Sequence, residues 1–362
     1  MKLLNLIDMK KLFRILTVFT LTTLVAVPQM MAGNDNRRGT AGATELLINP
    51  WARNSGWGGV NTANARGLDA LFTNVAGLSF VEATEVSYTN TMYLGGKRYG
   101  ASLNTIGLAR RLGDQAVLGA YVMTMGLGDI DVTTESSPEA GSNGTFSPSI
   151  MNLNVAFAYS FTTSIHGGVN IKVITESTAD VSATGIGLDA GIQYVTGDND
   201  ELKFGIALKN IGPAMSFSGT GMSFSVMNDF GKPITVEYRS SELELPTLLS
   251  IGVSYDFLMS KWDQRLTLAG NFTSNAFLRD NFMLGLEYSL LNRFQLRGAF
   301  VYQNDIFSAT NRTTAQTGIH AGASVAFPFG PEDKGRSFVI DYSFSSASPL
   351  RATHAVGASI KF

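Results

Sequence analysis

The sequence predicts an all-β fold, a transmembrane antiparallel β-barrel of about 14 strands with an amino-terminal hatch segment in its lumen. Three observations carry this prediction. Large apolar residues alternate with small or polar ones along most of the chain, and the connections between the alternating segments are short at one end and long at the other. In addition, only 15% of the 362 residues are charged although 44% are hydrophobic, whereas roughly a quarter are charged in soluble domains.

Residues 1–32 have the features of a secretory signal peptide. Residues 9–14 are basic, residues 15–27 carry no charge, and Ala32 is a small residue suited to cleavage. The apolar run is short for a membrane-spanning helix, which needs about 20 residues. We therefore expect cleavage after Ala32 or nearby, with Met1 or Met9 as the start of translation. Because the chain has no cysteine, we expect neither a lipoprotein anchor nor disulfides.

Alternation with a period of two is the strongest signal. In residues 151–161 every odd position is large and apolar and every even position is small or polar. This is strand behaviour, because successive side chains of a strand point to opposite faces. The same pattern predicts strands throughout a barrel domain over residues 83–362, at 83–92, 97–112, 115–126, 149–162, 165–177, 184–196, 200–211, 246–258, 262–274, 280–290, 292–303, 317–329, 336–346 and 351–362.

The second face of these strands and their connections distinguish a barrel from a soluble sandwich. The second face is mostly Gly, Ser, Ala and Asn with occasional charges, which suits a crowded lumen better than a solvated surface. The connections after odd-numbered strands are long at 127–148, 212–245 and 304–316, and those after even-numbered strands are mostly tight. Short periplasmic turns and longer extracellular loops are typical of outer-membrane barrels. We expect the protein in the cell outer membrane, in contact with lipid and lipopolysaccharide.

Aromatic residues near the strand ends fit interfacial girdles, although they could also be ordinary sheet-core residues. They are Tyr159, Phe161, Tyr194, Tyr255, Phe257, Tyr288, Tyr342 and Phe344. The last strand ends on Phe362. A terminal aromatic on an alternating strand resembles the signal by which barrel-assembly machinery recognises its clients, so we expect Phe362 to serve as that assembly signal.

Residues 33–82 do not alternate and carry a resemblance to a known family. An apolar stretch at 46–48 precedes Pro50, a glycine-rich turn follows, and the segment ends on Asn74-Val75-Ala76-Gly77-Leu78. This pattern resembles the amino-terminal signature of the PorV/PorQ family of outer-membrane proteins. Asn74, Ala76, Gly77 and Leu78 match the usual Asn-Pro-Ala-Gly-Leu. Val75 stands where proline is expected, so the local turn is expected to differ.

The PorV/PorQ family is related to the FadL-type long-chain fatty-acid transporters and belongs to the type IX secretion system of Bacteroidetes. The resemblance, closer to PorV-like than to PorQ-like members, implies a FadL-like barrel of fourteen strands with residues 33–82 inside it as a hatch. It also implies partners: the outer-membrane translocon, other secretion-system proteins, and secreted cargo that carries a carboxy-terminal signal domain.

Catalytic and metal-binding motifs are missing from the sequence. His166, His320 and His354 are far apart, with no His-Glu-x-x-His pair, and no Gly-x-Ser-x-Gly elbow is completed. The net charge of −2 gives no reason to expect a nucleic-acid partner. We therefore predict a non-enzymatic protein with no catalytic residue, no cofactor and no metal.

The connection over residues 212–245 is unusually rich in large apolar residues among Ser and Gly. They are Met215, Phe217, Met222, Phe224, Met227 and Phe230. Exposed apolar groups of this kind mark protein contacts, and Met adapts to varied partners. The sequence leaves two interpretations open: this loop binds a partner, or it folds over the barrel mouth and packs on itself or on the hatch.

Three functions compete. The resemblance favours a component of the type IX secretion system that holds translocon or cargo through its extracellular loops, to support export and surface attachment. The alternative is a FadL-like transporter of hydrophobic solutes, for which we would expect an apolar pocket lined from the lumen, whereas the inward faces are mostly Gly, Ser and Asn. A lipid-modifying barrel enzyme would need a Ser, His and acid set, and none is visible in the sequence.

Overall fold

The structure is a computed structural model that describes residues 33, 35–96, 100–139, 143–259, 263–329 and 336–362. The expected signal peptide, residues 1–32, lies outside the described residues. Within them, no helix is long and apolar enough to cross a membrane.

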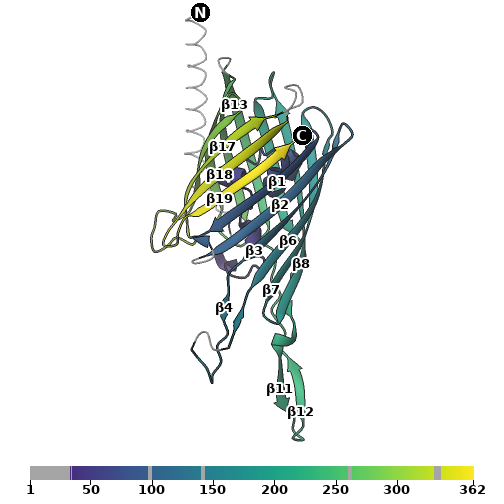
Figure 1. Ribbon diagram of the computed structural model, residues 1–362, viewed down its shortest axis with the longest axis vertical. Coiled ribbons are helices and arrows are strands. Elements are labelled where there is room, and N and C mark those ends of the chain that lie inside the picture. Colours follow the sequence, from purple (N-terminus) through teal and green to yellow (C-terminus); the bar gives the residue numbers. More distant parts are fainter. Residues whose placement is uncertain (1–32, 34, 97–99, 140–142, 260–262, 330–335) are drawn as a thin grey trace, which may run out of the picture.

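Fourteen long strands of the described chain form one closed antiparallel barrel (Figure 1). Each strand pairs with its neighbours in chain order, and β1 also pairs with β19, for example Val86 with Ile360. This confirms the fold class expected from alternation. The barrel strands are β1 (Thr84–Tyr93), β2 (Ala101–Leu112), β3 (Ala116–Gly126), β6 (Ser149–Ser160), β7 (Ile165–Thr178), β8 (Val181–Thr196), β9 (Leu202–Ile211), β13 (Leu248–Met259), β14 (Gln264–Asn275), β15 (Asn281–Leu290), β16 (Phe294–Gln303), β17 (Gln316–Pro328), β18 (Ser337–Ala347) and β19 (Thr353–Lys361).

The alternating residues point as the sequence predicts along most strands. On β6, Leu153 and Val155 are exposed on the outer face, whereas Asn152 and Asn154 are buried in the lumen. The outer faces of the other strands also carry exposed Ile, Leu, Val and aromatic side chains. A continuous apolar exterior of this kind suits contact with lipid.

The connections are short at one rim of the barrel and long at the other, as their lengths in the sequence predict. At one rim the turns are short, and Leu291 and Asn292 of the three-residue β15–β16 turn both have φ above +50°, the left-handed conformation found in tight turns. At the other rim two hairpins project beyond the barrel (Figure 1). One contains β4 (Ile130–Asp131) and β5 (Thr145–Phe146), and the other contains β11 (Ser223–Met227) and β12 (Pro233–Glu237).

The amino-terminal segment forms short helical turns packed inside the barrel. The elements are η1 (Asp35–Arg37), η2 (Thr44–Leu47), α2 (Ala52–Gly56), η3 (Gly67–Asp69), α3 (Ala70–Thr73) and η4 (Val75–Phe80). Helix α2 contacts β17 and β18, and η4 contacts β6, β7 and β8. We call residues 33–82 the hatch.

Part of the inner wall is apolar, which corrects the expectation that the second face carries mostly Gly, Ser, Ala and Asn. On β3, Val117, Tyr121 and Met123 are buried on the inner side. They form one hydrophobic core with Trp51 and Leu78 of the hatch. The physical reason is that the hatch needs an apolar surface to pack against, and the wall supplies it locally.

The matching residues of the family signature lie where the hatch meets the wall. The Asn74 Nδ2 atom donates to the carbonyl oxygens of Thr62 (2.9 Å) and Ile192 (3.1 Å), while its Oδ1 atom caps η4 by accepting from the Ala76 N–H. Val75 occupies the first position of η4, a place that also suits proline. These residues therefore fix the hatch against β8.

Candidate functional site

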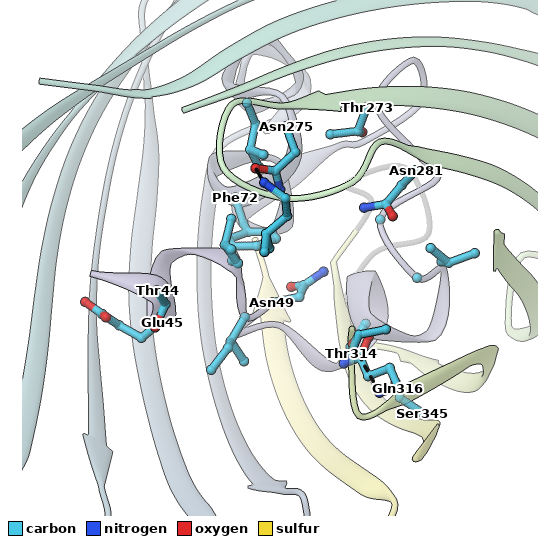
Figure 2. A pocket seen from close by; sticks show the side chains of 18 of the residues that line it. Thr44, Glu45, Asn49, Phe72, Thr273, Asn275, Asn281, Thr314, Gln316 and Ser345 are labelled. Carbon is cyan, nitrogen blue, oxygen red and sulfur yellow. Dashed lines mark hydrogen bonds between the residues drawn. The ribbon is translucent and has the colours of Figure 1, made fainter. Parts of the chain in front are cut away.

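A cavity of about 660 Å³ lies between the hatch and the rim that carries the long loops. Its base is made by residues 44, 45, 47–49 and Phe72 of the hatch. Its walls are the loop-side ends of the strands, with Thr273, Asn281 and Gln316 among the side chains seen in Figure 2. The volume falls within the roughly 300–1,000 Å³ typical of small-molecule sites.

Much of the cavity lining is apolar. Met125 of β3, Ile150 of β6, Leu248 of β13 and Met283 of β15 all line it. This is the apolar pocket expected of a transporter, which the mostly small and polar inward faces did not predict. Each of these residues occupies the inward phase of its strand, close to the loop end. A large apolar residue in the otherwise small or polar phase was the signal that could have located the cavity.

The polar groups of the cavity are held by specific contacts. The Lys209 Nζ atom donates to the Phe72 carbonyl oxygen (2.9 Å) and lies 4.2 Å from the centre of the Phe72 ring. The Arg279 guanidinium donates to the Asn304 carbonyl oxygen and to the Asp305 carboxylate, each at 2.8 Å. The two cationic side chains thus sit at fixed places on the lining.

Glu45 on η2 is the most unusual polar residue of the cavity. It is only 4% exposed, and its Oε1 atom has no hydrogen-bond partner among the described residues. Burial and the neighbouring Glu176 carboxylate of β7 both disfavour its ionised form, which raises the pKa of Glu45 to about 7.

On the short-turn side of the hatch, ion pairs cross the lumen. The Arg53 Nε atom on α2 lies 3.2 Å from the Asp341 carboxylate of β18 and 3.8 Å from that of Asp69. The Arg297 Nε atom lies 2.8 Å from the Glu287 carboxylate. A second cavity among these charged residues holds about 110 Å³. These charges on the inner face are therefore paired, and the pair of Arg53 with Asp341 ties the hatch to the wall at the short-turn side.

The six apolar residues singled out in the connection over 212–245 do not form one surface. Met215 is buried against Leu46 of the hatch and Ile174 of β7, and Phe217 packs on the same cluster. The other four residues lie further along the projecting loop. Met222 is half-buried in η6 (Thr220–Met222), and Phe224, Met227 and Phe230 belong to the β11–β12 hairpin.

The outer end of the β11–β12 hairpin is apolar and exposed. Phe224 stacks on Tyr238 with a centroid distance of 4.5 Å. Met227 and Phe230 are 72% and 87% exposed. Met215 and Phe217 therefore pack on the hatch cluster, as one interpretation expects, while the hairpin presents apolar side chains to the outside. That the loop binds a partner stays a prediction.

Two of the histidines contact serines, which the sequence analysis did not foresee. The His166 Nδ1 atom lies 3.0 Å from Ser79 Oγ and 3.1 Å from Ser160 Oγ, and the His320 Nδ1 atom lies 2.8 Å from Ser345 Oγ. In the part of the chain that the structure describes, neither imidazole has a hydrogen-bonded carboxylate, and no three His, Cys, Asp or Glu side chains come together. Of the histidines and serines in these contacts, only His320 and Ser345 line the main cavity.

Comparison with known proteins shows similarity at the level of structure. No family model and no curated protein sequence matches the chain. The fold is similar to that of the CymD monoaromatic hydrocarbon channel, with a TM-score of 0.53 and 13% identity over 87% of this chain and 98% of that one. It is also similar to the toluene transporter TodX of Pseudomonas putida, with a TM-score of 0.50 and 13% identity over 83% and 94% of the two chains.

These two likenesses show a shared fold. The protein has a FadL-like barrel. A further similar structure is a FadL homologue of Pseudomonas aeruginosa, with a TM-score of 0.49 and 13% identity over 86% of this chain and 98% of that one. A barrel of this fold with an apolar exterior supports a location in the outer membrane.

Proposed function

We propose that the protein is a non-enzymatic outer-membrane channel. It takes up small hydrophobic solutes through the cavity between the hatch and the rim that carries the long loops. The observation that carries this proposal is the cavity itself, about 660 Å³ in volume and lined by Ile150, Leu248 and Met283 at the loop side of the barrel. Its position suits capture of a solute from outside. The similar structures include a monoaromatic hydrocarbon channel and a toluene transporter, which supports the same class of solute.

The lining also indicates what kind of solute fits best. Apolar walls favour a compact apolar body, because its burial removes apolar surface from water. Asn49, Thr273 and Gln316 add hydrogen-bonding groups on the same lining. We therefore expect solutes with an apolar body and at most a small polar end.

Uptake by cells that lack or produce the protein tests this function. Labelled monoaromatic compounds and fatty acids should enter producing cells faster. Leu248→Trp, which places a larger side chain in the cavity, should reduce the gain, whereas Leu249→Trp on the outer face of the same strand should not. Equal uptake with and without the protein, for both solute classes, would rule the channel function out.

A second candidate function is supported by the β11–β12 hairpin and by the amino-terminal signature. Phe230 and Met227 at the hairpin tip are among the most exposed apolar side chains of the described residues. Residues 74–78 resemble the signature of a type IX secretion component. On this reading the hairpin binds translocon or cargo during export and surface attachment.

Gene deletion distinguishes the two functions. A secretion component is expected to be required for surface display of proteins with a type IX carboxy-terminal signal, and Phe230→Ser with Met227→Ser should reduce recovery of its partners. Ser225→Ala on the same hairpin is the control. Undiminished display after deletion excludes the secretion role, and it leaves the solute-uptake experiment unaffected.

A further inference from the structure

Two carboxyl groups meet where the hatch touches the loop-side wall. Element η2 is anchored by Ala43 and Leu46, which pack with Ile174 of β7. This anchoring directs Glu45 toward the wall, away from the other labelled cavity side chains (Figure 2). Glu176 lies two residues beyond Ile174 on the same inner face of β7, and it is the charged neighbour that acts on Glu45.

Asn152 of β6 completes the group. It pairs in register with Ile174, so its side chain is the diagonal neighbour of Glu176 on the inner face. The Asn152 amide lies beside the Glu45 carboxyl. Asn152 is 3% exposed, and its Oδ1 atom, like Glu45 Oε1, has no hydrogen-bond partner among the described residues. Two buried oxygen atoms are thus unsatisfied at one place, which native structures rarely tolerate.

Among the residues that the structure describes, no cation is paired with this group. In the described part of the chain, neither Glu45 nor Glu176 has an ion-pair partner. Lys172, the nearest lysine along β7, is paired with Asp189 at 2.8 Å. The other cations of the cavity lining, Lys209 and Arg279, are engaged with Phe72 and with Asn304 and Asp305. A buried carboxylate beside a second, half-buried one is costly without a counter-ion.

We propose that Glu45, Glu176 and Asn152 bind a divalent cation of the calcium type that joins the hatch to the barrel wall. Calcium takes six to eight oxygen ligands in irregular geometry, from carboxylates, amide oxygens and water. Rotation of the Asn152 amide by half a turn directs Oδ1 instead of Nδ2 toward Glu45, since the two ends occupy nearly the same space. The cavity, which Glu45 and Glu176 both line, admits the remaining water ligands.

The cation would add a link between η2 and β7 on the loop side of the hatch, where Arg37 of the hatch already pairs with Glu244. Arg53 already ties the hatch to β18 near the short-turn side, whereas Glu45 faces the opposite half of the lumen. A bound cation therefore adds to the packing of η2 a contact with β7 that depends on calcium outside the cell. The calcium site does not depend on which solute or partner the protein binds.

Calcium titration of the purified full-length protein in detergent tests the site. We expect calorimetry to show one calcium site and the melting temperature to rise with calcium and fall again with EDTA. Glu45→Gln and Glu176→Gln should each lower the affinity by at least about tenfold and remove the thermal shift. Because both changes relieve repulsion, these variants should fold. Glu135→Gln on the exposed β3–β6 loop should behave as the unmodified protein does.

Three results would overturn the site. One is a melting temperature that does not respond to calcium between EDTA and millimolar concentrations. Another is a calcium response that survives in both Gln variants, which would assign the ion to residual lipopolysaccharide. The third is a melting temperature that depends on the protonation of Glu45 but not on calcium, which would mean that the two carboxyl groups share a proton instead.

Discussion

Gly77 shows at the scale of one residue why the amino-terminal signature is demanding. A Cβ atom at this position would lie 2.0 Å from the Ala65 carbonyl oxygen, which is backbone and cannot move aside. Gly77→Ala should therefore destabilise the protein by about 1–3 kcal/mol, as overpacking does. Thermal unfolding in detergent measures this loss. Gly126→Ala is the matched control, because nothing lies within 4 Å of that site. Equal melting temperatures for the two variants would contradict the prediction.

Asp69 gives the hatch a pH dependence. Burial raises the pKa of the Asp69 carboxyl from its usual 3.8 to about 7, although Arg53 opposes the shift. A raised carboxyl pKa means that the folded state binds more protons than the unfolded state between these two values. The contribution of Asp69 to stability is therefore fully present below about pH 4 and is lost as the pH rises toward 7.

Asp69→Asn should flatten this dependence. The amide cannot ionise, so the variant should keep a more constant melting temperature between pH 4 and pH 7 than the unmodified protein. Thermal unfolding in detergent over this pH range measures the difference. Parallel curves for the two proteins would show that Asp69 does not contribute to the pH dependence.

The β11–β12 hairpin is an element that can be removed without touching the barrel. The Tyr238 N–H donates to the Met222 carbonyl oxygen (3.0 Å), so the two ends of the hairpin lie side by side. Deleting residues 223–237 and joining Met222 to Tyr238 should leave the melting temperature of the barrel unchanged. If the hairpin binds a partner, co-purification of that partner should fall. A collapse of barrel stability would instead assign the hairpin a structural role.

The strands were predictable and the hatch packing was not, for a physical reason. Alternation is a local property. The outward face of residues 151–161 can be predicted from that segment alone. The inner face of β3 is different, because Val117 and Met123 are apolar only to match Trp51 and Leu78 of the hatch. The cavity depends on the same long-range match, so its apolar lining could not be located from one strand at a time. The contact between Glu45 and Glu176 joins residues 131 positions apart and leaves no local pattern.

The whole barrel depends on closure between its first and last strands, and Phe362 lies at this seam. Its N–H donates to the Thr84 carbonyl oxygen (2.9 Å), while its ring is exposed and makes an edge contact with Phe329 at 6.3 Å. The backbone hydrogen bond does not depend on the side chain. Phe362→Ser should therefore cost little stability once the barrel has formed, because the residue is 45% exposed and keeps its backbone hydrogen bond.

The loss from Phe362→Ser should appear during assembly. If the terminal aromatic is the recognition signal, the variant should accumulate poorly in the outer membrane but, when refolded in detergent, should melt as the unmodified protein does. Phe329→Ser removes the neighbouring ring of the same contact without changing the terminus, so it should assemble normally. Comparing heat-modifiable protein in outer-membrane fractions with melting temperatures in detergent separates the two effects. Normal accumulation of the Phe362 variant would show that the seam closes without a terminal signal and that strand pairing alone is sufficient.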